Sequence, residues 1–128
     1  MRPQARLLGL VIAAATGISL PAAAADFYEG KQIKLIVGTP PSGAYDSYTR
    51  IMAPFWSEHI PGHPTIVVQN MGGSGGLQAA NYMFNIAEKD GTVIGAMENN
   101  IPTAPILLPE NAKFDAAAFG WKIGRAHV

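Results

Sequence analysis

The segment that most constrains the fold is a β-branched run followed by a glycine-rich loop and then by a helical pattern. Residues 65–68 read Thr-Ile-Val-Val, a composition typical of a β-strand. Four glycines follow within residues 72–76, and apolar side chains then recur at helical spacing across residues 77–87. In α/β proteins, a strand, a glycine loop and a helix in this order present backbone N–H groups to an anion.

The same order of elements occurs one unit earlier in the chain. Residues 32–37 are mainly apolar and predict a first strand, residues 38–44 form a loop rich in glycine and proline, and residues 45–60 have a helical pattern. The carboxyl ends of neighbouring parallel strands lie at one edge of a sheet. The two loops are therefore predicted to face each other across a ligand-binding cleft.

The rest of the chain continues the alternation of strands and helices, which predicts an α/β fold with a parallel sheet and crossover helices. Residues 92–97 predict a third strand, residues 99–109 predict a loop with at most one helical turn, and residues 114–121 are too short to assign. An open sheet of this size leaves an unpaired edge, so we expect an N-terminal fragment of a larger protein.

The predicted first helix carries several residues of interest. Tyr48, Ile51, Met52, Phe55 and His59 share one face of it, and Trp56 is expected to be buried. Pro54 should kink this helix or break it into two, because proline removes a hydrogen bond and clashes with the preceding turn.

Two charged residues near the start of this helix allow more than one interpretation. Asp46 is either a helix cap or a group facing the ligand, and the sequence leaves both open. Arg50 is expected to lie on a solvated face, and the alternative is a clamp for an anionic ligand.

The first 25 residues have the pattern of a signal peptide. Arg2 and Arg6 precede a mainly apolar run at residues 7–20, and small residues at 21–25 suit a signal peptidase, with cleavage expected after Ala25. The apolar run would span about 21 Å as a helix, too short for a bilayer core of about 30 Å. We therefore predict export to the periplasm.

Composition excludes several classes of function. The chain has no cysteine, which excludes disulfides and thiol chemistry, and its formal net charge of zero does not favour nucleic-acid binding. His59 and His63 flank a Pro-Gly turn without zinc-site spacing, so no metal site is predicted. Residues 122–128 resemble the in-frame reading of a common sequencing adapter and are expected to be a non-native tail.

The glycine loop itself lacks the features of a nucleotide site. No Gly-Lys-Ser/Thr sequence ends it, and it does not fit G-x-G-x-x-G in register. It does satisfy G-x-S-x-G, so a secreted α/β-hydrolase with Ser74 as nucleophile remains the alternative. The only histidine after Ser74 is His127, within the expected tail. We therefore predict a binding protein that is not an enzyme and needs no cofactor, with two neutral, donor-rich loops that suit a small carboxylate.

Several ordered motifs support this interpretation through a family resemblance. They are Phe27-Tyr-Glu-Gly-Lys31, Ile36-Val-Gly38 with Pro40, Pro41, Gly43 and Asp46, Ile60-Pro-Gly62, Pro64-Thr-Ile-Val-Val-Gln-Asn70, Gly73-Ser-Gly-Gly76, Ala79-Ala-Asn-Tyr82 and Lys89-Asp-Gly-Thr92. Through these motifs, from residue 27 to about residue 121, the sequence resembles the Bug-type extracytoplasmic solute receptors, the substrate-binding components of tripartite tricarboxylate transporters.

The resemblance implies a periplasmic-binding-protein-like (type II) α/β domain, of which residues 26–121 would be the N-terminal part of the first lobe. It also implies a small carboxylate or related metabolite as ligand, a transient contact with membrane transporter subunits, and a monomer. A further alternative is a partner-binding or chemosensory module without a dedicated transporter. Carried over position by position, the ligand-binding residues are Gly38, Thr39, Pro40, Pro41, Ser42, Gly43, Asp46, Asn70, Gly73, Ser74, Gly75 and Gly76.

The chain departs from the family pattern within both loops. Thr39 stands where a phenylalanine is usual, Ser42 replaces a glycine, Gly72 replaces a proline, and Ser74 replaces an alanine. The additional hydroxyl groups of Thr39, Ser42 and Ser74 are potential donors to a ligand. The ligands of the relatives therefore do not predict the ligand of this protein.

Overall fold

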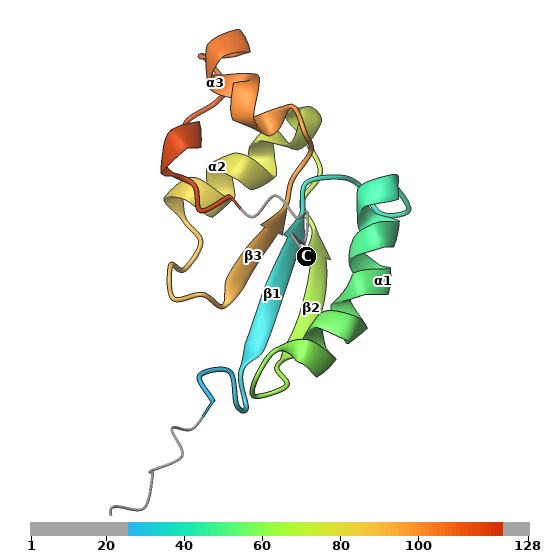
Figure 1. The fold of residues 1–128 in the computed structure, drawn as a ribbon. Coiled ribbons are helices and arrows are strands. Elements are labelled where there is room, and N and C mark those ends of the chain that lie inside the picture. Colours follow the sequence, from blue (N-terminus) through green and yellow to red (C-terminus); the bar gives the residue numbers. More distant parts are fainter. Residues whose placement is uncertain (1–25, 122–128) are drawn as a thin grey trace, which may run out of the picture.

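The fold was analysed in a computed structural model, which describes residues 26–121 (Figure 1). The predicted signal peptide and the predicted non-native tail lie outside the described residues. Within residues 26–121 no helix has the length and the apolar composition needed to cross a bilayer.

The centre of the fold is a three-stranded parallel sheet in the order β2-β1-β3. Its strands are β1 (Gln32–Val37), β2 (Thr65–Asn70) and β3 (Val93–Ala96). β1 is the central strand, and its Ile33, Leu35, Ile36 and Val37 are buried. The predicted bounds of β1 are confirmed, and so is the α/β class with parallel strands and crossover helices. This arrangement is the one expected for part of a periplasmic-binding-protein-like domain.

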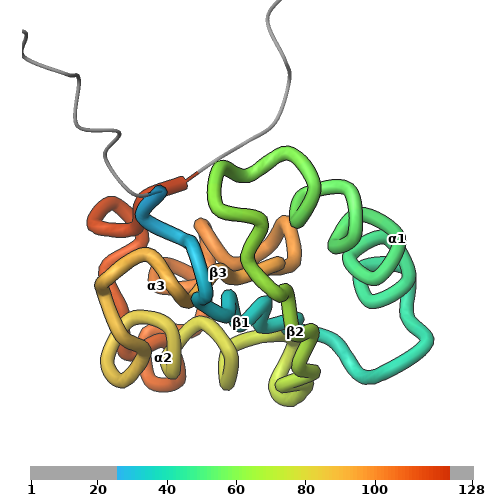
Figure 2. The backbone as a smooth tube through the Cα atoms, turned by 90° about the horizontal axis from the view of Figure 1, so that it is seen from below, coloured from blue at the N-terminus to red at the C-terminus, as the bar shows by residue number. Residues whose placement is uncertain are grey.

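Two helices cover the two faces of the sheet. Helix α1 (Ala44–His59) connects β1 to β2, and α2 (Leu77–Asn85) connects β2 to β3 (Figures 1 and 2). The first connection moves outward from β1, and the second moves back across β1 to the far side. Right-handed crossovers that move in opposite directions place their helices on opposite faces. Because the three strands are parallel, both loops that precede these helices start at the carboxyl ends of the strands, on the same side of the sheet.

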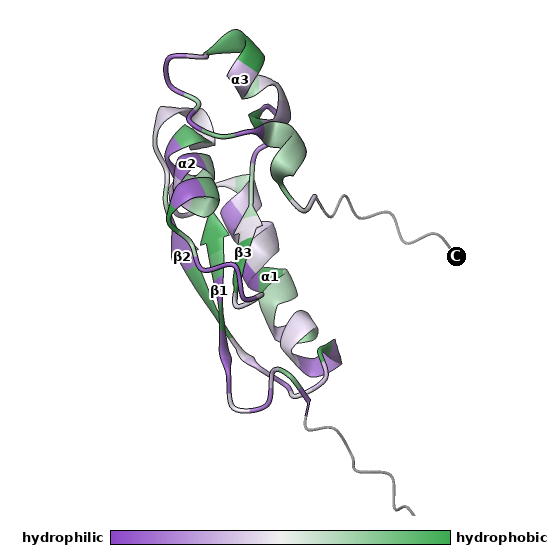
Figure 3. Cartoon of the chain, turned by 90° about the vertical axis from the view of Figure 1, so that its left-hand side faces the viewer, coloured by the Kyte–Doolittle hydropathy of each residue, from purple (hydrophilic) through white to green (hydrophobic). Residues whose placement is uncertain are grey.

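The segment after β3 packs on α2. A 3₁₀ turn at Ile101–Thr103 runs into the short helix α3 (Ala104–Leu107), so this loop contains more helix than the one turn expected. Residues 114–121, unassigned from the sequence, include a 3₁₀ turn at Ala116–Ala118. Apolar residues from α2 and from these later segments form one core cluster: Leu77, Ala80, Ile101, Ala104, Ala112 and Phe114, with Phe84 and Phe119 packed against it. Figure 3 shows apolar colouring along the strands and on α3.

Helix α1 differs from its prediction in two respects. It runs as one helix through Pro54, so the predicted break into two helices is wrong. Pro54 is exposed and removes a single backbone hydrogen bond, which the bonds on either side of it outweigh.

The second difference concerns which face of α1 is buried. Tyr48, Ile51, Met52 and Phe55 do share a face, but all are exposed, and Trp56 is exposed rather than buried. The helix instead buries Asp46, Thr49 and Ala53. Small side chains allow α1 to lie close to β2, and Asp46 is retained inside because its hydrogen bonds are satisfied there.

Candidate ligand-binding site

The loops that follow β1 and β2 lie side by side at the carboxyl edge of the sheet. Val37 and Asn70 are register partners at the ends of the two strands, and the Met71 N–H donates to the Val37 carbonyl over 2.8 Å. The contact continues into the loops, since a Cβ on Gly72 would lie 2.8 Å from the nitrogen of Pro40. Only glycine at position 72 allows the two loops to approach so closely.

The glycine loop owes its composition to its backbone. Gly73, Ser74, Gly75 and Gly76 all have positive φ angles, of 145°, 48°, 61° and 82°. A side chain on Gly73 would also lie 2.5 Å from Oε1 of Gln78. Consecutive positive φ angles favour glycine, so the residues around Ser74 are explained by the path of the chain.

The first turn of α1 supplies free backbone donors beside this loop. Gly43 is the N-cap residue and makes no side-chain cap, and the first backbone bond runs from the Ser47 N–H to the Gly43 carbonyl. The N–H groups of Ala44, Tyr45 and Asp46 make no hydrogen bond within residues 26–121. Free N–H groups and the helix dipole give this end of α1 a positive potential that attracts anions.

Thr39 places a buried hydroxyl group next to these donors. The residue is only 7% exposed, and its Oγ1 has no hydrogen-bond partner among the described residues. A Cβ built on Gly43 would lie 3.5 Å from Thr39 Oγ1, so the hydroxyl lies beside the N-cap of α1. Burying an unpaired hydroxyl is costly, by about 1–3 kcal/mol. Such a group in a native structure calls for an explanation.

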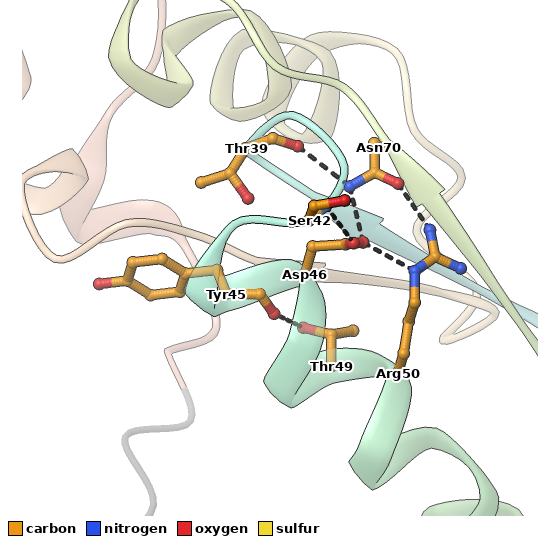
Figure 4. A network of polar contacts seen from close by, with 7 residues as sticks. All are labelled: Thr39, Ser42, Tyr45, Asp46, Thr49, Arg50 and Asn70. Carbon is orange, nitrogen blue, oxygen red and sulfur yellow. Dashed lines mark hydrogen bonds and ion pairs between the residues drawn. The ribbon is translucent and has the colours of Figure 1, made fainter.

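Asp46 accepts hydrogen bonds on both of its carboxylate oxygens (Figure 4). Oδ2 accepts from the Ser42 N–H over 2.8 Å, and Oδ1 accepts from Asn70 Nδ2 and Arg50 Nε over 2.8 and 2.9 Å. The Ser42 N–H, followed by the Asn70 amide and the Arg50 guanidinium, lowers the pKa of Asp46 to about 2. The carboxylate caps no backbone N–H within α1 and instead fixes the loop that precedes the helix.

Asn70 links the end of β2 to the first loop. Its Nδ2 also donates to the Thr39 carbonyl over 3.1 Å, and its Oδ1 accepts from Arg50 Nη2 over 2.7 Å. Arg50 thus contacts residues of both strand–helix units, while its side chain remains half exposed, as predicted. The available signal was the spacing of Asp46 and Arg50 by four residues, which places the two charges on one face of a helix.

The segment after β3 also borders the two loops, which the sequence reasoning missed. The Asn99 N–H donates to Tyr45 Oη over 3.3 Å, and Asn100 Nδ2 donates to the Gly75 carbonyl over 3.4 Å. The topology could have placed this segment beside the loops, because residues 97–100 follow the carboxyl end of a third parallel strand. All of the predicted ligand-binding residues thus lie at one edge of the sheet, with Asn99 and Asn100 beside them.

The geometry does not assemble a hydrolytic site around Ser74. Ser74 follows the carboxyl end of β2, whereas His63 precedes the amino end of that strand and His59 ends α1 nearby. A six-residue strand is about 20 Å long, so neither imidazole reaches the Ser74 hydroxyl. His127 lies outside the described residues. Within residues 26–121 no group of histidine, aspartate or glutamate side chains could hold a metal ion.

A parallel α/β sheet with two touching, donor-rich loops at the ends of neighbouring strands is an arrangement found in α/β proteins that bind small molecules. Comparison with known proteins narrows this class. Protein BugT of Bordetella pertussis is 39% identical over 71 residues, which cover 56% of this chain and 21% of BugT. The chain is therefore related to the Bug proteins, as its motifs predict.

The matched stretch spans about a fifth of the length of BugT. No family model and no solved structure matches the chain. The ligand and the mechanism of binding therefore have to be argued from the site itself.

Proposed function

We propose that this protein is a periplasmic solute receptor that binds a small carboxylate between its first two strand–helix loops and delivers it to a membrane transporter. The relationship to BugT supports a receptor for a small molecule and not an enzyme. The carboxylate is proposed from the chemistry of the loops, which offer N–H and hydroxyl donors. Among residues 26–121 their one nearby cation is Arg50, which is already paired with Asp46.

The observation that carries the proposal is the unpaired hydroxyl group of Thr39. It is buried beside Gly43, the N-cap of α1, and the N–H groups of Ala44 and Tyr45 that follow Gly43 are free among the described residues. Each hydrogen bond to a charged acceptor contributes about 1.5–3 kcal/mol net. Three of them, reduced by the entropy lost on binding, are sufficient for micromolar affinity, about −8 kcal/mol.

Replacement of Thr39 by valine tests this role because valine keeps the shape and removes the hydroxyl. We expect Thr39→Val to leave the unliganded protein equally stable or to stabilise it by up to about 1 kcal/mol, since a buried unpaired group is lost. The same variant should bind the carboxylate about tenfold more weakly, a loss of about 1.4 kcal/mol. Chemical denaturation and titration calorimetry measure the two effects.

The ligand for this titration is chosen from a panel of mono-, di- and tricarboxylates by the shift in melting temperature of the wild-type protein. Thr49→Val is the matched control, because the Thr49 hydroxyl is paired with the Tyr45 carbonyl over 2.6 Å on the sheet side of α1. It should lower stability and leave affinity unchanged. Unchanged affinity in Thr39→Val, or no melting shift with any carboxylate, would contradict the proposal.

A further inference from the structure

The two loops that form the candidate site belong to different strand–helix units, so something must set the distance between them. Backbone pairing ends with the Met71 N–H, and beyond that point the loops face each other without a shared ladder. The side chains that cross from one loop to the other are Asp46 and Asn70, 24 residues apart, and they meet over 2.8 Å. Arg50 bonds to both (Figure 4).

The hydrogen-bonding groups of Asp46 and Asn70 are already engaged, whereas Arg50 uses two of its five N–H donors. Asn70 donates to the Thr39 carbonyl and to Asp46, and its own oxygen accepts from Arg50. An amide has two N–H donors, so Asn70 has none left for a ligand. Both Asp46 oxygens accept hydrogen bonds, and the residue is only 3% exposed. These residues were predicted from the sequence to touch the ligand, and their contacts instead point inward.

We propose that Asp46, Arg50 and Asn70, here called the loop bridge, are positioning residues that hold the two loops at the spacing the ligand requires, and that Asp46 and Asn70 do not contact the ligand. This inference rests on the proposed function of the loops as a carboxylate site. Asp46 and Asn70 together restrain Ser42 and Thr39, so the bridge fixes both ends of the first loop against β2.

The charges of the bridge also suit an anionic ligand. An unpaired carboxylate at position 46, in the first turn of α1, would repel an incoming anion and offset the positive end of the helix. The ion pair with Arg50, at 2.9 Å, neutralises it. The bridge therefore orders the loops without adding net charge to the site.

A double-mutant cycle distinguishes positioning from contact with the ligand. The variants are Asp46→Asn, Asn70→Ala and the double variant, all assayed well below the lowest melting temperature of the set. If the residues act through one another, each single variant should bind carboxylate about tenfold more weakly, and the double variant no more weakly than the worse single one. Independent contacts with the ligand would instead multiply to about a hundredfold, which would overturn the proposal.

Hydrogen exchange of the unliganded variants gives a second readout that needs no ligand. The backbone N–H groups of residues 39–46 and 72–76 should exchange faster in all three variants than in the wild type. The matched control is Asn81→Ala, because Asn81 also bonds two backbone groups of a distant segment, the Asn111 carbonyl and the Lys113 N–H, over 2.9 and 2.7 Å. It should speed exchange near residue 112 and leave both loops unchanged.

The two readouts separate the two proposals. Faster exchange in the loops, in a protein that binds no carboxylate, would reject the proposed function and keep the positioning role. Unchanged exchange in the loops of Asn70→Ala would overturn the positioning role, whatever the affinity.

Discussion

Ser42 is the residue at which the first loop is most visibly strained. Its φ angle is 70°, a left-handed conformation that costs a residue with a side chain about 1–2 kcal/mol. Its N–H donates to Asp46, which explains why the backbone holds this conformation. The strain is therefore local, and the carboxylate that compensates for it lies four residues away.

Replacement of Ser42 by glycine should relieve this strain. We expect Ser42→Gly to stabilise the protein by up to about 1 kcal/mol, because the relief exceeds the entropy that glycine adds to the unfolded chain. The bond from the backbone of residue 42 to Asp46 is kept. Urea denaturation measures the change.

Ser47→Gly is the matched control for this prediction. Ser47 is exposed within α1, where glycine should cost about 0.5 kcal/mol relative to serine. Two changes from serine to glycine, five residues apart, should thus have opposite signs. A loss of stability in both would show that the conformation of Ser42 carries no strain.

At the scale of the element, α1 combines a regular helix with a proline in its interior. Pro54 lies on the exposed side of the helix and leaves the Arg50 carbonyl without its intrahelical donor. The helix tolerates this because Thr49 and Ala53 pack its other side against the sheet. Tertiary packing, not local propensity, keeps the helix continuous.

Pro54→Ala should therefore stabilise the protein by about 1–3 kcal/mol, since alanine restores the hydrogen bond. The greater freedom of the unfolded alanine variant offsets only part of this gain. Thermal and urea denaturation measure the gain. The control is Pro109→Ala, which lies outside any helix and should be neutral or cost about 0.5 kcal/mol. Equal effects of the two substitutions would show that the interior position of Pro54 costs nothing.

At the scale of the whole molecule, the buried carboxylate of Asp46 makes stability depend on pH. Its pKa is lowered from 3.8 to about 2, so the folded protein binds its proton less readily than the unfolded chain does. The resulting stabilisation is fully present above about pH 4 and is lost as the pH falls through about 2. Asp90, whose pKa is lowered by its bonds from Thr92, contributes in the same direction.

Asp46→Asn should reduce the dependence of stability on pH between pH 4 and pH 2. The variant should be less stable than the wild type at pH 6, and the difference should shrink steadily as the pH is lowered from 4 to 2. Denaturant midpoints recorded across that range measure it. A difference that stays constant with pH would show that Asp46 contributes through packing alone.

Much of this fold could be predicted from the sequence because the causes are local. The β-branched run at residues 65–68 begins β2, and the bounds of β1 follow from its apolar residues. The glycines of the second loop are required by positive φ angles and by the approach of Pro40, so their composition alone indicated a tight loop. From parallel strands it then followed that both loops share one edge of the sheet.

The tertiary structure alone determined which residues distant along the chain become hydrogen-bond partners. Trp56 of α1 was expected to be buried, yet the helix buries Asp46, Thr49 and Ala53 instead. Asp46 can be buried because it finds its donors in Ser42, Arg50 and Asn70. The unpaired hydroxyl of Thr39 depends likewise on what surrounds it after folding. Local conformation follows from each residue and its neighbours in sequence. Whether a buried polar group is hydrogen-bonded depends instead on atoms that folding brings together.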